Sequence, residues 1–178
     1  MAVVARPGAG KSCMAPALVG LEEPGLGRLS LDGRDVAHLD RASLREAAAL
    51  VRGGECFSGT VLDNVALGRP GVDRERAWAA LERVGLKRVV QGMEGADLAP
   101  LTRGEARRLM FARALAARPR LLVVDDGLEG VEAEHREALA GLLAAPDAPW
   151  RLVVLAHDEG DALVRRCQRV VRWEGRKP

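Results

Sequence analysis

The sequence has few of the features that mark several common protein classes. Its three cysteines, Cys13, Cys56 and Cys167, are odd in number and widely spaced, with no CxxC pair. Neither a disulfide framework nor a zinc site is indicated, and a reducing cytoplasm fits best. The longest apolar runs, such as residues 152–156, fall far below the roughly 18 to 20 residues that span a bilayer. Any role at a membrane is therefore expected to come through a partner.

Charge gives no reason to expect nucleic acid as a partner. The 27 lysine and arginine residues stand against 25 acidic residues, and the positive charges are scattered along the chain. No internal repeat or low-complexity tract is present, and residues 1–4 are too short for the apolar core of a secretory signal. We expect no nucleic-acid binding, and the short start predicts that an upstream segment is missing.

The length and composition of the sequence are sufficient for one folded domain over residues 1–178. Hydrophobic residues make up 48% and charged residues 29%, as in ordinary folded proteins. Apolar runs of strand length alternate with segments whose apolar residues recur every three or four positions, which predicts α/β layers. The mostly helical stretch 59–117 predicts a helical subdomain inserted in the α/β core. The predicted strands are residues 2–5, 48–51, 121–124 and 152–156, with a short antiparallel element at 29–33, and the predicted helices are 12–21, 41–47, 73–84, 105–117 and 133–143.

The most specific motif follows the first predicted strand. Residues 5–12 read ARPGAGKS, which matches the phosphate-loop pattern G-x-x-x-x-G-K-[ST] except that Ala5 replaces the first glycine. Glycines allow backbone amides to curl around phosphate oxygens, and the following helix directs its positive end at them. Lys11 is predicted to neutralise the β and γ phosphates, and Ser12 to offer its hydroxyl to Mg²⁺. The predicted cofactor-binding residues of this loop are Pro7, Gly8, Ala9, Gly10, Lys11, Ser12 and Cys13.

Three points qualify this motif. A glycine-rich turn that only joins a strand to a helix is the alternative interpretation, and the complete GxGKS in the right context favours phosphate binding. Cys13 stands where a second hydroxyl often helps to hold phosphate, and a thiol is a weaker donor. Pro16 removes a backbone donor early in the following helix, which predicts a kink near the nucleotide.

Later segments resemble one family of phosphate-loop proteins. FSGTVLDNVALGRP at residues 57–70 resembles the stretch that follows the glutamine loop in ABC exporters, and LTRGEARRLMFARALAARPRLLVVDD at 101–126 resembles the LSGGQ-type signature motif, its helix and the Walker B strand. Residues 130–132 lie where the D-loop would follow, and His157 ends a strand as the family's switch histidine does. Over nearly its whole length the chain resembles the ATP-binding domain of an ABC transporter.

The resemblance implies a fold, a ligand and partners. The fold is the RecA-like P-loop NTPase, a parallel sheet flanked by helices with an inserted helical subdomain. Two such domains would pair head to tail, as a homodimer or heterodimer, and hold ATP between one phosphate loop and the opposite signature motif. The further partners are the transmembrane domains of an ABC transporter, so the chain would lie at the cytoplasmic face of the membrane. It would couple ATP binding and hydrolysis to export.

The same resemblance assigns roles to single residues. Asp125 and Ser12 would hold Mg²⁺, Asp126 would occupy the general-base position in ATP hydrolysis, and His157 would sense the γ phosphate. A carboxylate that ends a buried strand beside a phosphate loop suits a hard cation, and a second carboxylate suits the orientation of water. The signature residues that would approach the partner's nucleotide are Thr102, Arg103, Gly104 and Glu105.

Several positions depart from the family pattern. Residues 52–54 are Arg-Gly-Gly where the glutamine belongs, residues 102–105 replace Ser-Gly-Gly-Gln, and Glu132 replaces the D-loop aspartate. Asp126 replaces a glutamate, and misplacing a base by about 1 Å costs on the order of a hundredfold in rate. The antiparallel strands and the adenine-stacking aromatic residue that usually precede the phosphate loop have no counterpart. ATP binding is expected, whereas hydrolysis is expected to be slow or absent.

Other hypotheses stay open. The chain could be a non-catalytic nucleotide-binding or dimerisation module, or a truncated fragment without an independent role. Asp125 and Asp126 could form a solvated strand end, and His157 could be a surface histidine, but the order of all motifs favours the family roles. Arginines at helical spacing predict a solvated face or domain-interface contacts. These are Arg107, Arg108 and Arg113.

Overall fold

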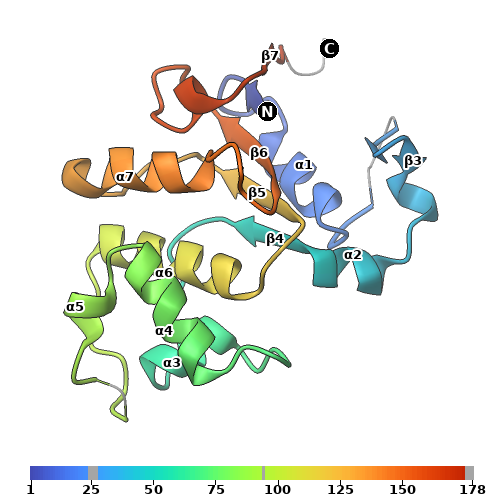
Figure 1. The fold of residues 1–178 in the computed structure, drawn as a ribbon. Helices are drawn as coiled ribbons and strands as arrows, with labels where there is room; N and C mark the ends of the chain where they lie inside the picture. The colour runs from blue at the N-terminus through green and yellow to red at the C-terminus, as the bar shows by residue number, and fades with distance from the viewer. Residues whose placement is uncertain (24–27, 94, 175–178) are drawn as a thin grey trace.

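The computed structural model describes residues 1–23, 28–93 and 95–174. The sheet strands are β1 (Ala2–Val4), β4 (Ala48–Val51), β5 (Leu121–Asp125), β6 (Arg151–Ala156) and β7 (Val170–Arg172). The helices are α1 (Lys11–Leu18), α2 (Arg41–Ala47), α3 (Val61–Ala66), α4 (Arg74–Arg83), α5 (Lys87–Val90), α6 (Arg103–Ala116) and α7 (Ala133–Leu143). The strands form one parallel sheet in the order β4-β5-β6-β1-β7, flanked by helices (Figure 1). The predicted α/β fold class is confirmed.

The central strands are buried on both faces of the sheet. Leu122 and Val124 of β5 belong to a large apolar cluster that includes side chains of α6 and α7. Val123, between them, belongs to a second cluster with side chains of α1 and α2. Successive strand residues point to opposite faces, so each face of the sheet has its own core. Such strands are nearly continuous apolar runs in sequence, and this is why their positions could be predicted.

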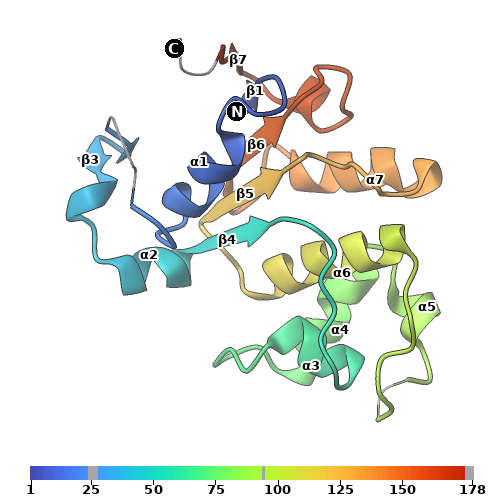
Figure 2. The same ribbon diagram turned by 180° about the vertical axis from the view of Figure 1, so that it is seen from behind.

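Helices α3 to α6 follow β4 and precede β5 in the chain. They form a lobe at one side of the sheet, away from α1 and from the two short strands β2 (Ser30–Leu31) and β3 (Arg34–Asp35) (Figures 1 and 2). Both α3 and α4 contact α6, and the lobe's core includes the fully buried Leu81, Leu109 and Phe111. This lobe is the inserted helical part of the predicted fold. Within residues 1–23, 28–93 and 95–174, no helix is long and apolar enough to cross a membrane.

Three details differ from or refine the predictions. The strand β7 was not predicted, because it is three residues long and lies at the sheet edge beside β1, with Val170 exposed. The predicted helix 12–21 ends at residue 18, where Gly20 adopts a φ of 73° and the amide of Leu21 donates to the carbonyl of Pro16. Such a left-handed glycine cap closes a helix. The predicted short antiparallel element is confirmed as β2 (Ser30–Leu31) paired with β3 (Arg34–Asp35).

Candidate functional site

The phosphate loop joins the end of β1 to the start of α1. Gly8 and Gly10 have φ values of 79° and 97°, and Gly10 is the residue that precedes the first turn of α1. This left-handed conformation strains residues with a side chain, which explains the two glycines. Ala5, in place of the motif's first glycine, is buried, and its amide donates to the carbonyl of Ala156 at 3.0 Å. Its φ is not positive, so an alanine fits there without strain.

Lys11 holds its ammonium group inside the loop. The side chain is buried, and Nζ donates to the carbonyl oxygens of Ala5 at 2.6 Å and Arg6 at 3.1 Å. The loop borders a cavity of about 340 Å³. A compact cation at the floor of a glycine-lined cavity is suited to bind phosphate oxygens. The cavity is lined by Pro7, Gly8, Gly10, Lys11, Asp126 and His157.

The contacts predicted for two further residues of this loop stay predictions. The side chain of Ser12 lies outside the described part of the structure, so its contact with Mg²⁺ stays a prediction. Cys13 is exposed, and its backbone amide donates to the carbonyl of Gly10 at 3.1 Å. Its contact with phosphate likewise stays a prediction.

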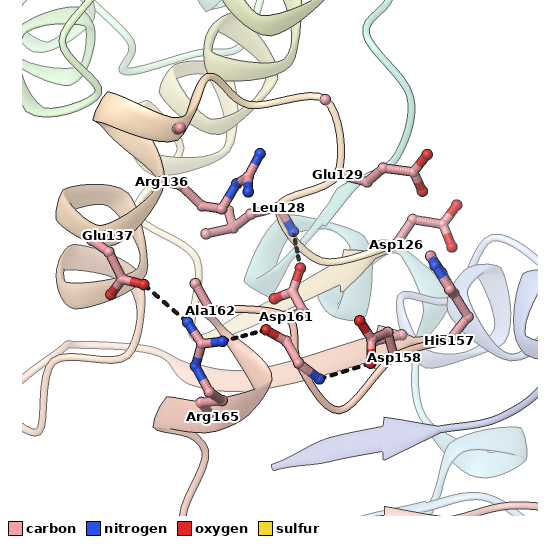
Figure 3. Close-up of a pocket in the computed structure, with 14 residues that line it drawn as sticks. Asp126, Leu128, Glu129, Arg136, Glu137, His157, Asp158, Asp161, Ala162 and Arg165 are labelled. Atoms are coloured by element: carbon pink, nitrogen blue, oxygen red, sulfur yellow. Dashed lines mark hydrogen bonds and ion pairs between the residues drawn. The ribbon is translucent and has the colours of Figure 1, made fainter.

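The two carboxylates predicted to act in the site lie where β5 ends. Asp125 is the last residue of the strand and is buried, whereas Asp126 is exposed and has a φ of 64°. The carboxylate of Asp126 lies beside the His157 ring, which follows β6 (Figure 3). Because neighbouring parallel strands end at the same edge of a sheet, β5 and β6 place these side chains together next to the phosphate loop.

The buried carboxylate of Asp125 has an unusual electrostatic environment. Burial raises the pKa of Asp125, and the neighbouring charge of Asp126 raises it further, while Arg52, Arg107 and Lys11 offset part of the effect. Arg52 is a direct partner, because its Nε lies 3.5 Å from Oδ2 of Asp125. A buried carboxylate with a raised pKa, next to a phosphate-binding loop, is typical of a functional site.

Neutralising this carboxylate is expected to stabilise the fold at neutral pH. A pKa that is higher in the folded state than in the unfolded state favours folding at low pH, and this contribution is lost as the pH rises through the folded pKa. Asp125→Asn should therefore unfold at higher urea concentration than the natural chain at pH 7. The difference should shrink as the pH falls toward roughly 4, near the pKa of an unfolded aspartate. Asp147→Asn, at an exposed position, controls for the loss of one carboxylate, and a destabilised Asp125→Asn at pH 7 would contradict the argument.

The loops after β5 and β6 are joined by Asp161. Its Oδ2 accepts from the amide of Leu128 at 2.9 Å (Figure 3), and its Oδ1 accepts from the amide of Leu163 at 2.8 Å. A cavity of about 370 Å³ lies between these loops and α7, and Asp126, Glu129 and His157 are among its lining residues. Asp161 thus fixes the two loops that carry the predicted catalytic side chains.

The four predicted signature residues lie at the start of α6. Thr102 Oγ1 accepts from the amide of Glu105 at 3.2 Å, and Glu105 Oε2 accepts from the amide of Thr102 at 2.8 Å, so the two side chains form a capping box. The side chain of Arg103 is 81% exposed and lies 3.5 Å from Oε1 of Glu129. Gly104 is buried against the side chain of Glu132. In the described part of the chain, none of the four lines the phosphate-loop cavity, so a role toward a partner's nucleotide stays a prediction.

The interpretation of three arginines of α6 as a solvated face is wrong. Arg107, Arg108 and Arg113 are all buried. Arg108 pairs with Glu132 at 3.1 Å and donates to the carbonyl of Gly85, while Arg113 donates to the carbonyl of Asn64 at 2.7 Å. The contacts with Gly85 and Asn64 lie within the lobe, and the ion pair with Glu132 joins the lobe to the residue before α7. Their charges are satisfied mainly by backbone carbonyls, which the sequence pattern does not reveal.

Arg107 is the site residue that sequence reasoning missed. Its guanidinium donates from Nη1 to the carbonyl of Gly53 at 2.9 Å, and from Nη2 to the carbonyls of Asp125 at 2.6 Å and Gly127 at 2.9 Å. Burial lowers the pKa of Arg107, and the charges of Asp126 and Asp125 oppose this shift. One side chain of α6 thus connects the loop after β4 with the end of β5. The signal in the sequence was the consecutive apolar run Leu109 to Phe111. These residues are buried, and such a run indicates a helix that is covered on most sides.

Comparisons with known proteins point to one family. A family model described as ABC transporter matches residues 1–129. The mycobactin import ATP-binding/permease protein IrtB of Mycolicibacterium smegmatis is 31% identical over 182 residues, which cover 98% of this chain and 31% of that protein. The methionine import ATP-binding protein MetN of Caulobacter vibrioides is 35% identical over 180 residues, which cover 94% of this chain and 53% of that protein. The chain thus spans about a third to a half of the length of these relatives.

A solved structure has the same fold. The structure of a bacterial Atm1-family ABC exporter with ATP bound matches with a TM-score of 0.82 at 24% identity. The match covers 97% of this chain and 32% of that chain. The parallel sheet, its flanking helices and the inserted lobe are therefore those of the P-loop NTPase fold.

Proposed function

Since the chain belongs to the ABC transporter family, as the match over residues 1–129 and the relatives at 31% and 35% identity show, we propose that it binds ATP and couples this binding to transport across a membrane. The observation that carries the proposal is the ammonium group of Lys11, buried in the phosphate loop beside the cavity that Gly8 and Gly10 line. The phosphates of ATP would displace the two carbonyl contacts of Lys11. The loop amides and the start of α1 would complete the phosphate site.

The residues around the cavity suit a slow hydrolysis of ATP. Asp126 would orient the attacking water and accept its proton, and His157 would donate to a γ phosphate oxygen. Both side chains line the phosphate-loop cavity. Because the aspartate is shorter by one methylene than the usual glutamate, its carboxylate would lie farther from the reacting atoms. Binding is therefore proposed as the main property of this site, with slow turnover.

Mg²⁺ is proposed as the second ligand, with Asp125 and Ser12 as the residues that would hold it. When bound, Mg²⁺ neutralises charge on the β and γ phosphates. No cluster of three or more His, Cys, Asp or Glu side chains suited to a metal occurs among residues 1–23, 28–93 and 95–174. Mg²⁺ sites of nucleotide-binding proteins usually use only one or two carboxylates together with the phosphates. The donor at Asp125 fits the ion in chemistry, but the carboxylate already has Arg52 as a partner.

The partners proposed are transmembrane domains and a second ATP-binding domain. Residues 1–178 would form one ABC-type ATP-binding domain with residues 59–117 as its helical subdomain, placed at the cytoplasmic face of the membrane. The start of α6 would meet the nucleotide of the second domain through its backbone amides, because the capping box engages Thr102 and Glu105. Names of relatives include both import and export proteins, so export stays a prediction. The comparisons do not favour a non-catalytic module or a fragment without a role.

Lys11→Ala is expected to weaken ATP binding at least about tenfold, because one charge-assisted contact to phosphate contributes roughly 1.5 to 3 kcal/mol. Calorimetric titration of the purified chain with Mg-ATP measures the affinity, and a phosphate-release assay on the same samples measures turnover. Lys87→Ala, on the exposed side of α5, is the matched control and should bind like the natural chain. A folded natural chain that binds no ATP would overturn the proposal. Binding without phosphate release would limit it to nucleotide binding.

A further inference from the structure

An arginine lies beside the carboxylate that is proposed to hold the metal. In the pairing of β4 with β5, Val51 is the partner of Val124. Arg52 is the next residue after β4, and Asp125 is the next residue in β5, so the register of the sheet places them together. Nε of Arg52 lies 3.5 Å from Oδ2 of Asp125. The strand pairing places the two residues side by side, and the side chain of Arg52 completes the contact.

The environments of the two partners differ. The side chain of Asp125 is 4% exposed, whereas that of Arg52 is 52% exposed. The charge of Arg52 therefore compensates a buried carboxylate while part of its guanidinium still faces solvent. Arg107 and Lys11 add positive charge near the same carboxylate. The protein itself thus supplies the cations that a buried carboxylate requires.

A divalent ion at this position would compete with the arginine. Mg²⁺ requires oxygen ligands at about 2.0 to 2.1 Å in near-octahedral geometry. A guanidinium in contact with Oδ2 of Asp125 occupies one of these ligands, and its charge repels the ion. A guanidinium is also suited to bind phosphate oxygens with two parallel hydrogen bonds.

We propose that the guanidinium of Arg52 takes over part of the charge-neutralising role of Mg²⁺, so that this site binds a nucleoside triphosphate nearly as well without the metal as with it. The inference rests on the proposed ATP binding and specifies the form of the ligand, a metal-free nucleoside triphosphate. Arg52 acts as a specificity-determining residue in this arrangement. It sets the balance between metal-bound and metal-free nucleotide.

The test is the affinity for ATP with excess Mg²⁺ and with EDTA, measured by equilibrium dialysis of the purified chain. For the natural chain the two affinities should agree within about threefold, whereas Arg52→Gln should bind ATP about tenfold more weakly in EDTA and regain affinity with Mg²⁺. Glutamine removes the charge and adds a side-chain oxygen at the place where the family has its glutamine, so the affinity in EDTA, where no metal is present, is the measurement that isolates the loss of charge. Arg74→Gln, exposed on α4, is the matched control and should behave like the natural chain.

A second readout follows the metal directly. In the presence of ATP, the Mn²⁺ electron paramagnetic resonance signal measures bound metal, and Arg52→Gln should bind Mn²⁺ more tightly than the natural chain. A natural chain that loses as much ATP affinity in EDTA as Arg52→Gln would overturn the role of Arg52 and leave ATP binding intact. If the folded natural chain bound no ATP either with Mg²⁺ or with EDTA, the proposed function itself would be overturned. The two failures are therefore distinguishable.

Discussion

Arg107→Met is expected to lower the free energy of unfolding by about 3 to 5 kcal/mol. The guanidinium donates to the carbonyls of Gly53, Asp125 and Gly127, and the side chain is buried. Methionine fills a similar volume but offers no donor, so three carbonyls lose their partner. A hydrogen bond from a charged donor contributes roughly 1.5 to 3 kcal/mol, and a buried acceptor without a partner adds its desolvation penalty. Urea unfolding followed by circular dichroism measures the loss.

The control for this variant is Arg74→Met, which removes an exposed arginine from α4 and should change the stability by less than about 0.5 kcal/mol. The comparison separates the loss of the three contacts from the loss of one positive charge. A change of similar size in both variants would show that water replaces the arginine at the carbonyls. ATP binding by the folded fraction of Arg107→Met should also weaken, because the end of β5 would lose its connection to the loop after β4.

The parts of the fold that could be predicted have strong local signals. The strands β4, β5 and β6 were predicted within one residue at each end, because both of their faces are buried and the sequence is a continuous apolar run. The strand β7 has only three residues, at the exposed edge of the sheet. Its pairing with β1 depends on the arrangement of the whole sheet, so no local pattern marks it.

The same distinction applies to the site. The phosphate loop could be predicted because its motif specifies a backbone conformation, and Gly8 and Gly10 have the positive φ angles that it requires. The contact between Arg52 and Asp125 joins residues that are far apart in the sequence and depends on strand register. The contacts of Arg107 are with backbone carbonyls, whose positions the residue types do not encode. The sequence motifs thus predicted where the site lies, whereas the charged contacts within it could be identified only from the structure.

The second large effect is expected at Gly127, directly after the two carboxylates. Gly127 has a φ of 52°, and a Cβ atom added there would lie 2.5 Å from Oδ2 of Asp161. The left-handed conformation costs an alanine roughly 1 to 2 kcal/mol. Relief of the contact requires the Asp161 carboxylate to move, although it holds the amides of Leu128 and Leu163, at about 1 kcal/mol for each lost bond. Gly127→Ala should therefore lower the free energy of unfolding by about 3 kcal/mol.

Gly141→Ala is expected to have the opposite effect on the free energy of unfolding. Gly141 lies within α7, and a Cβ added there meets no atom within 4 Å, so alanine should stabilise the chain by up to about 1 kcal/mol. The double variant Gly127→Ala/Asp161→Ala separates the two causes at Gly127. Because the contact with the carboxylate is already gone in Asp161→Ala, the two changes should be less than additive by about 1 to 2 kcal/mol. Full additivity would mean that backbone strain alone accounts for the effect, and Asp161 would then have no part in it.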